Sequence, residues 1–174
     1  MIAHSDQGPE SVLLVTGTLG AGKTATAMAA YDILEQRGVP VAFVDLDGLS
    51  YCRPSKGPYN EELVLEAIGR LWPVYRAAGA KRLVLARVVE TREALQRYED
   101  VLGCRQIIVC RVTASPSTCE ARLRAREPDS ELASHLARTQ EVEGILQRAQ
   151  LEDFTVENEG RPIEETAQEV LVRS

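Results

Sequence analysis

Residues 17–24 of the chain read Gly-Thr-Leu-Gly-Ala-Gly-Lys-Thr, and the apolar run Val12–Val15 comes just before them. This spacing, G-x-x-x-x-G-K-[ST] between a strand and a helix, is the pattern of a phosphate-binding loop. Its glycines allow a tight turn whose backbone N–H groups can point at phosphate oxygens, and the following helix adds the positive end of its dipole. The feature therefore predicts a strand–loop–helix unit that binds a nucleoside triphosphate.

Two side chains of this loop have the chemistry that a bound triphosphate needs. The Lys23 ammonium can reach the β- and γ-phosphates, and the Thr24 hydroxyl can bind Mg²⁺. A glycine-rich turn without a ligand is the alternative, but helix-favouring residues follow as far as Gly38 and give the motif its required setting. We expect ATP to contact the loop and the residue after it: Gly17, Thr18, Leu19, Gly20, Ala21, Gly22, Lys23, Thr24 and Ala25.

Composition narrows the partners of such a site. The chain has 174 residues, which fits a single domain over 1–174, and its net charge of −6 favours neither nucleic acid nor an anionic membrane as a partner. The four cysteines and two histidines lack the spacing of a metal site, so we expect reduced structural thiols. Residues 1–11 are unlike a signal or transit peptide, and no apolar run is long enough to cross a membrane. A cytoplasmic protein is therefore expected.

Apolar, β-branched segments alternate with helical ones along the chain, which predicts βαβ units and a parallel sheet. We expect strands at 12–16, 40–44, 82–86, 106–112 and 153–157, and helices at 23–37, 60–78, 91–102, 116–127, 131–150 and 162–173. Asn60 is expected to cap its helix, Pro73 to kink or break it, and Pro116 to begin another. The longest irregular stretch, 48–59, is a candidate functional loop.

Ligands of open parallel sheets bind beyond the carboxyl ends of the strands. Directly after the second expected strand comes Asp45-Leu46-Asp47-Gly48, and an arginine-rich helical segment, 119–128, follows the fourth. The sequence has no guanine-reading Asn-Lys-x-Asp segment, which disfavours a GTPase. Together with the phosphate-binding loop, these features resemble the small P-loop kinases. That family of adenylate-kinase-like proteins includes shikimate, gluconate and adenylylsulfate kinases and antibiotic phosphotransferases.

The resemblance covers nearly the whole chain and is strongest at 17–24, 45–47, 122–127 and 156–162. It implies a three-layer αβα P-loop NTPase fold with a five-stranded parallel sheet of order 2-3-1-4-5. It also implies a short mobile lid at about residues 122–135. It does not identify the substrate.

The acidic pair after the second strand receives roles from the same resemblance. Asp47 would be the general base or would orient the acceptor hydroxyl, and Asp45 would hold water ligands of Mg²⁺. The chemistry agrees, since in-line phosphoryl transfer needs an oriented acceptor oxygen whose proton a carboxylate can accept. A plain acidic turn before Gly48 is the alternative.

After the third strand the family often has a small, glycine-rich turn, whereas this chain has Arg87-Val88-Val89-Glu90. Arg87 can face an anionic substrate or the transferring phosphate. Glu90 can accept a bond from a substrate hydroxyl, or the two residues form a structural ion pair. Arg138 resembles an arginine that faces the substrate in related kinases.

The segment 119–128 resembles the lid of these kinases. Arg122 and Arg126 are four residues apart and so share a helix face, while Arg124 points away. Two cations on one face can neutralise charge on transferring phosphate oxygens when a lid closes. The alternative is a solvated helix in which Glu127 and Asp129 act as counterions.

Two loops complete the expected site. Arg161 and Pro162 lie in a segment that resembles the loop beside the nucleotide base in this family, so they would flank adenine unless the segment is a plain turn. In loop 50–59, Arg53 and Lys56 favour an acceptor with a phosphate, sulfate or carboxylate, and the tyrosines can stack on a ring. A solvated loop is the alternative.

The leading hypothesis is an ATP- and Mg²⁺-dependent kinase that phosphorylates a hydroxyl of a small metabolite. The partners would be a nucleoside triphosphate and a small-molecule acceptor, and the protein would be a monomer or homodimer. A nucleoside monophosphate or adenylylsulfate is an alternative acceptor. A non-catalytic ATP-binding regulator, or a resistance protein that sequesters a drug, is the hypothesis from another class.

Overall fold

The structure is a computed structural model that describes residues 8–55, 57–126 and 128–174. Its strands are β1 (Ser11–Thr16), β2 (Val41–Asp45), β3 (Arg82–Ala86), β4 (Ile108–Thr113) and β5 (Phe154–Glu157). Its α-helices are α1 (Lys23–Gln36), α2 (Glu61–Ala77), α3 (Arg92–Leu102), α4 (Pro116–Arg126), α5 (Asp129–Ala149) and α6 (Ile163–Arg173). The 3₁₀ helices η1 (Leu46–Ser50) and η2 (Pro58–Asn60) follow β2.

The five strands form one sheet in the order β2-β3-β1-β4-β5, and every neighbouring pair is parallel. Strand β1 is central: Val12 is in register with Leu83 of β3, and Leu13 with Ile108 of β4. This order confirms the fold class predicted from the sequence. Because the strands are parallel, all of their carboxyl ends meet at one edge, where the phosphate-binding loop begins.

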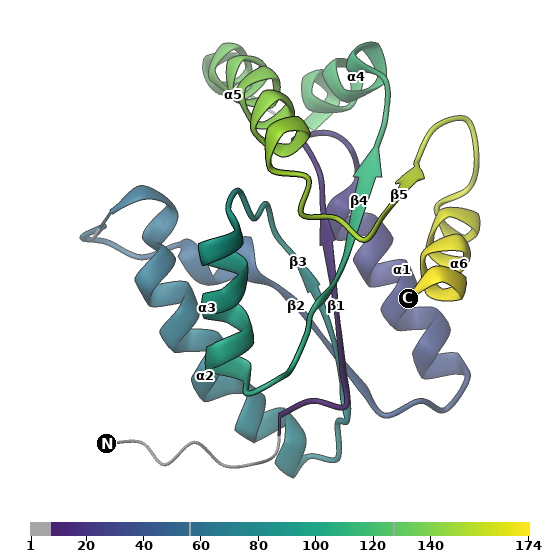
Figure 1. Ribbon diagram of the computed structural model, residues 1–174. Helices are drawn as coiled ribbons and strands as arrows, with labels where there is room; N and C mark the ends of the chain where they lie inside the picture. Colours follow the sequence, from purple (N-terminus) through teal and green to yellow (C-terminus); the bar gives the residue numbers. More distant parts are fainter. Residues whose placement is uncertain (1–7, 56, 127) are drawn as a thin grey trace.

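Helices cover both faces of the sheet, giving the three layers seen in Figure 1. Val12 and Leu14 of β1 belong to the core under α2 and α3. Leu13 and Val15 belong to the core under α1 and α6. Burial on both faces explains why this strand reads as a continuous apolar run rather than as an alternating one.

The helices α4 and α5 lie at the carboxyl end of the sheet, above the ends of β1 and β4 (Figure 1). Helix α4 begins at Pro116 as predicted, and the Ser115 hydroxyl accepts a hydrogen bond from the Thr118 amide at 3.2 Å. The predicted lid, 122–135, corresponds to the second half of α4 and the start of α5. Among the described residues, no helix combines the length and apolar character that crossing a membrane requires.

The structure corrects two local expectations about α2, the first in full and the second in part. The side chain of Asn60 does not cap α2, and the backbone of this residue is left-handed (φ 49°). Its side-chain Nδ2 donates instead to the carbonyl oxygens of Ser50 at 2.7 Å and Cys52 at 3.2 Å. These bonds close the loop between η1 and η2, so part of the segment expected to be irregular is ordered. At Pro73, where a kink or a break was expected, the helix does not break, since α2 continues to Ala77; the expected kink stays a prediction.

Candidate functional site

The loop between β1 and α1 is tightly enclosed. Gly20 and Gly22 have φ values of +81° and +101°, which side-chain-bearing residues rarely adopt. A Cβ on Gly20 would lie 2.6 Å from the Cys119 carbonyl oxygen, and one on Gly22 would lie 2.2 Å from Nδ2 of Asn158. The loop thus needs glycine both for its conformation and for the approach of α4 and the segment after β5.

Gly22→Ala is expected to weaken the binding of Mg·ATP about thirtyfold. The substitution imposes backbone strain of about 2 kcal/mol together with a contact that must be relieved by moving the loop. Gly48→Ala is the matched control, because a Cβ there meets nothing within 4 Å. Calorimetric titration of both variants with Mg·ATP tests this. Equal affinities would show that the loop conformation does not matter for the nucleotide.

Lys23 is the first residue of α1, and its ammonium folds back over the loop. Its Nζ donates to the Thr18 carbonyl oxygen at 3.1 Å. Burial lowers the pKa of Lys23 below its ordinary 10.5, while the negative charges of Asp47 and Asp45 oppose this shift. The ammonium therefore lies in a partly dehydrated place, where its attraction for phosphate oxygens is stronger than in water.

Thr24 and Asp45 join the start of α1 to the end of β2. The Thr24 hydroxyl donates to Oδ2 of Asp45 at 2.8 Å, and Oδ1 of Asp45 accepts the Asp47 amide at 3.0 Å. Magnesium prefers oxygen ligands, keeps several waters, and is usually bound by one or two side chains together with phosphates. This pair of oxygens fits that requirement. In the described part of the chain, no group of three or more His, Cys, Asp or Glu side chains is arranged to hold a metal alone.

Asp47 lies in η1, two residues after Asp45, and is held by a buried arginine. Arg87, at the end of β3, donates from Nη1 to Oδ1 of Asp47 at 3.3 Å and from Nη2 to Oε2 of Glu61 at 2.5 Å. Partial burial raises the pKa of Asp47, and the positive charges of Lys23 and Arg87 oppose that rise. Its side chain is still 54% exposed, so the carboxylate can meet a ligand.

Arg122, one of the two arginines predicted to clamp phosphate, contacts the loop backbone. Its Nη1 donates to the carbonyl oxygens of Gly20 and Ala21 at 3.2 Å each, and its Nη2 donates to the Asn158 carbonyl at 2.9 Å. Arg126 is exposed one turn further along α4, and its charge acts on Lys23 to lower its pKa. Both arginines are thus on the side of the phosphate-binding loop.

Asn158 is a site residue that the sequence reasoning did not single out. Its side-chain amide donates to the Ala21 carbonyl at 2.9 Å, and its own amide N–H donates to the Thr113 carbonyl at 2.8 Å. The residue thereby fastens the phosphate-binding loop to the end of β4. The available signal was a polar residue directly after the fifth strand, at the edge of the sheet where ligands bind.

Glu159 fixes the beginning of α4, the helix that carries both arginines. Its carboxylate accepts bonds from the Ser115 amide at 2.8 Å, the Ser115 hydroxyl at 2.7 Å and the Thr118 hydroxyl at 2.5 Å. These bonds lower the pKa of Glu159 from 4.5 to about 2. A charged carboxylate also suits the positive end of the helix dipole.

The lowered pKa of Glu159 predicts a contribution to stability that depends on pH. The contribution is present above about pH 4.5 and is lost as the pH falls toward about 2, because the folded state must then accept a proton that it binds poorly. Thermal unfolding of Glu159→Gln should therefore differ most from that of the parent protein above pH 4.5. The difference should shrink toward pH 2, whereas a constant difference would contradict this role. Glu164→Gln, an exposed change in the first turn of α6, is the control.

Arg138 of α5 connects to the loop after β3 and to η2. Its Nη2 pairs with Oε1 of Glu90, its Nη1 pairs with Oε2 of Glu141 at 2.8 Å, and its guanidinium lies 5.0 Å from the centre of the Tyr59 ring. The expected alternative pairing of Glu90 with Arg87 is therefore wrong, because each of these residues has other partners.

The remaining predicted residues that the structure describes belong to the segment after β5 and to the loop before η2. Arg161 is tied to α6 and to the end of β5, with its Nη1 2.8 Å from Oε2 of Glu169 and its Nη2 2.5 Å from the Glu157 carbonyl oxygen. Pro162 precedes α6, and Arg53 is exposed in the loop before η2. The expectations for Lys56 and Glu127 concern residues outside the described part of the chain.

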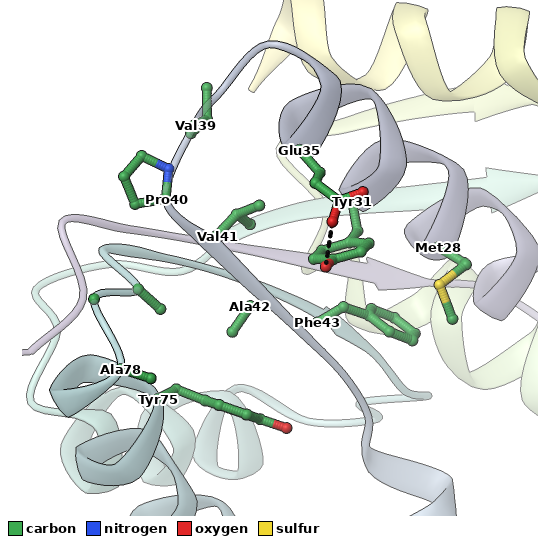
Figure 2. A pocket seen from close by; sticks show the side chains of 12 residues that line it. Met28, Tyr31, Glu35, Val39, Pro40, Val41, Ala42, Phe43, Tyr75 and Ala78 are labelled. Atoms are coloured by element: carbon green, nitrogen blue, oxygen red, sulfur yellow. Dashed lines mark hydrogen bonds between the residues drawn. The ribbon is translucent and has the colours of Figure 1, made fainter.

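A hollow of about 510 Å³ lies along the edge strand β2, between α1 and the end of α2 (Figure 2). Strand residues Val41, Ala42 and Phe43 line it, and the Tyr31 hydroxyl donates to Oε1 of Glu35 beside it at 3.4 Å. Among the described residues that form its wall, none belongs to the phosphate-binding loop or to the acidic pair. We therefore take the end of the sheet, and not this hollow, as the candidate site.

The sheet order together with a glycine-rich loop between the central strand and the first helix defines the class of P-loop nucleoside-triphosphate-binding folds. No family model matches the sequence, and no curated protein matches it. Solved structures do match this fold, and they are small P-loop kinases and a resistance protein.

The fold matches that of the APS kinase of Mycobacterium tuberculosis, solved with AMPPNP and APS, with a TM-score of 0.64 and 22% identity over 96% of this chain and 98% of that one. It also matches the tunicamycin resistance protein of Deinococcus radiodurans, with a TM-score of 0.62 and 17% identity over 94% of each chain. A gluconokinase of Sinorhizobium meliloti matches with a TM-score of 0.60 and 20% identity over 96% of this chain and 92% of that one. This chain therefore has the fold of the small P-loop kinases.

Proposed function

We propose that the protein is an ATP- and Mg²⁺-dependent kinase that transfers the γ-phosphoryl group to a hydroxyl of a small metabolite. The observation that supports this most is the convergence of Lys23, the Thr24–Asp45 pair and Asp47 at one end of the sheet. Phosphoryl transfer depends mainly on positioning and on stabilising charge, and these are the groups it requires.

Each residue has a distinct part in the proposal. The loop 17–25 and Lys23 bind the triphosphate, and Arg122 and Arg126 lie beside it to balance charge that develops on the phosphate oxygens. Thr24 and, through water, Asp45 would hold Mg²⁺, which supplies positive charge to the phosphates when it is bound. Arg161 and Pro162 would flank the base.

The acceptor would lie beside Asp47, which accepts the proton of its hydroxyl or orients it. Arg87 would act indirectly, because its guanidinium donates to Oδ1 of Asp47 and so orients that carboxylate. The acceptor would be enclosed, on the side away from Asp47, by Glu90, Arg138 and Arg53.

The free thiols of the cysteines support the expected cytoplasmic setting.

A screen tests the proposal directly. The protein is incubated with Mg·ATP and a pool of small hydroxyl compounds, and phosphorylated products are sought by mass spectrometry. The expected result is at least one product whose mass rises by one phosphoryl group, in amounts that depend on both protein and Mg²⁺. Tight ATP binding without any product would favour the non-catalytic regulator or drug-sequestering protein instead.

A further inference from the structure

We infer that the acceptor is a hydroxyl compound without a phosphate, sulfate or carboxylate group, an inference that rests on the proposed kinase function. The reason is an asymmetry in how the cations of the two halves of the site are partnered. On the nucleotide side Lys23 and Arg122 bond to backbone carbonyls, whereas on the acceptor side Arg87 and Arg138 are matched by carboxylates.

On the nucleotide side, the cations remain attractive to an anion. Lys23 donates to the Thr18 carbonyl, and Arg122 donates to the carbonyls of Gly20, Ala21 and Asn158. A carbonyl oxygen carries only a partial charge, so these bonds alone do not neutralise either side chain, although the negative charges of Asp47 and Asp45 also act on Lys23. Phosphate groups can therefore draw on the positive charge of these side chains.

On the acceptor side, Arg87 already forms ion pairs with two carboxylates. Its side chain is only 4% exposed, and both of its terminal nitrogens are bonded. One bonds to Asp47 and to the Leu46 carbonyl at 3.3 Å each, and the other bonds to Glu61 at 2.5 Å and to the Tyr59 carbonyl at 3.4 Å. An anionic acceptor would have to displace carboxylates from a buried guanidinium, which would leave those carboxylates without their partner.

Arg138, the second cation on this side, is matched in the same way. Glu90 and Glu141 each pair with one of its terminal nitrogens, the Tyr59 ring covers its guanidinium, and its side chain is 19% exposed. Among the ion pairs of the described residues on this side, two arginines thus stand against four carboxylates, those of Asp47, Glu61, Glu90 and Glu141, and Lys23 adds its charge near Asp47. Another negative charge in this place would be repelled.

The same carboxylates suit hydroxyl groups. In the described part of the chain, Oδ2 of Asp47 and Oε2 of Glu90 accept no hydrogen bond, so each can accept one from a hydroxyl. This side of the site therefore offers carboxylate oxygens to which the hydroxyl groups of a substrate can donate hydrogen bonds. Arg53 is exposed on the loop above and contributes a solvated charge at most.

The test uses inorganic sulfate as a probe, with the full protein saturated with Mg·AMPPNP so that the phosphate-binding loop is filled. Calorimetry is expected to detect no saturable sulfate binding tighter than about 10 mM. Glu90→Gln removes one partner of Arg138 and should create sulfate binding at least about tenfold tighter than that of the parent protein. Glu141→Gln, which removes the more exposed partner on the same helix, is the matched control and should have a smaller effect.

Saturable sulfate binding by the parent protein that is lost in Arg138→Met or Arg87→Met would overturn the inference. A second arm compares phosphorylation of matched neutral, carboxylated and phosphorylated compounds, and product from the charged sets would overturn it as well. Absence of product from every set counts against the kinase function alone. The sulfate titration still decides the charge preference in that case, so the two failures are distinguishable.

Discussion

Replacing Asp47 by Asn is expected to lower the turnover of the proposed kinase by about a hundred- to ten-thousand-fold, while the affinity for Mg·ATP changes little. The amide keeps the size of the carboxyl group but cannot accept the proton of the acceptor hydroxyl, and general-base catalysis contributes an effect of this order. The backbone amide of Asp47, which bonds to Asp45, is retained. Steady-state kinetics and calorimetric titration with Mg·ATP measure the two quantities separately.

The matched control for this change is Asp32→Asn, an exposed acid on the outer side of α1. It should leave turnover unchanged, because it removes a charge without touching the site. An equal loss of ATP affinity and turnover in Asp47→Asn would contradict the role given to this carboxylate, since it would then belong to the nucleotide or metal site.

Arg87→Met is expected to lower both the stability and the activity of the protein. Burial of Arg87 is nearly complete, and its loss leaves Asp47 and Glu61 without their shared cation, while the loop carbonyls lose a donor. Breaking a buried ion pair costs roughly 3–5 kcal/mol, but both carboxylates keep access to water, so a loss of about 2–3 kcal/mol in the free energy of unfolding is expected. Urea unfolding measures it.

Arg97→Met serves as the control, because Arg97 pairs with Glu62 on the surface through bonds of 2.6 and 2.7 Å. Pairs exposed in this way contribute little, so the stability of this variant should stay close to that of the parent protein. If both variants lose the same amount, burial does not decide the effect and our reasoning about Arg87 is wrong. Turnover of Arg87→Met should also fall, since no other described residue donates a hydrogen bond to Oδ1 of Asp47 to fix the orientation of this carboxylate.

The features predicted well from the sequence are those encoded by neighbouring residues. The glycine-rich turn from β1 into α1 is a contiguous pattern, and β3 lies at Arg82–Ala86 as expected because its apolar residues are consecutive. The order of the strands followed from the resemblance to small P-loop kinases rather than from local pattern, and the structure confirms it.

The features that the sequence did not reveal depend on contacts between distant residues. Arg87 was expected either to face an anionic substrate or the transferring phosphate, or to pair with the nearby Glu90, whereas its carboxylate partners are 40 and 26 residues away at Asp47 and Glu61. Asn158 bonds to a carbonyl 137 residues away, at Ala21. Nothing in the local sequence of an asparagine or an arginine specifies which distant backbone or side chain it will meet, because packing of the whole chain decides that.

Binding of the phosphates of a nucleoside triphosphate by the loop 17–24 is tested most directly by isothermal titration of the protein with Mg·ATP. We expect saturable binding with a dissociation constant between about 1 μM and 1 mM, a range typical of enzyme substrates, and at least about tenfold weaker binding by Lys23→Met. The contradicting result would be no heat of binding with either ATP or GTP at two temperatures, or equal affinity in Lys23→Met.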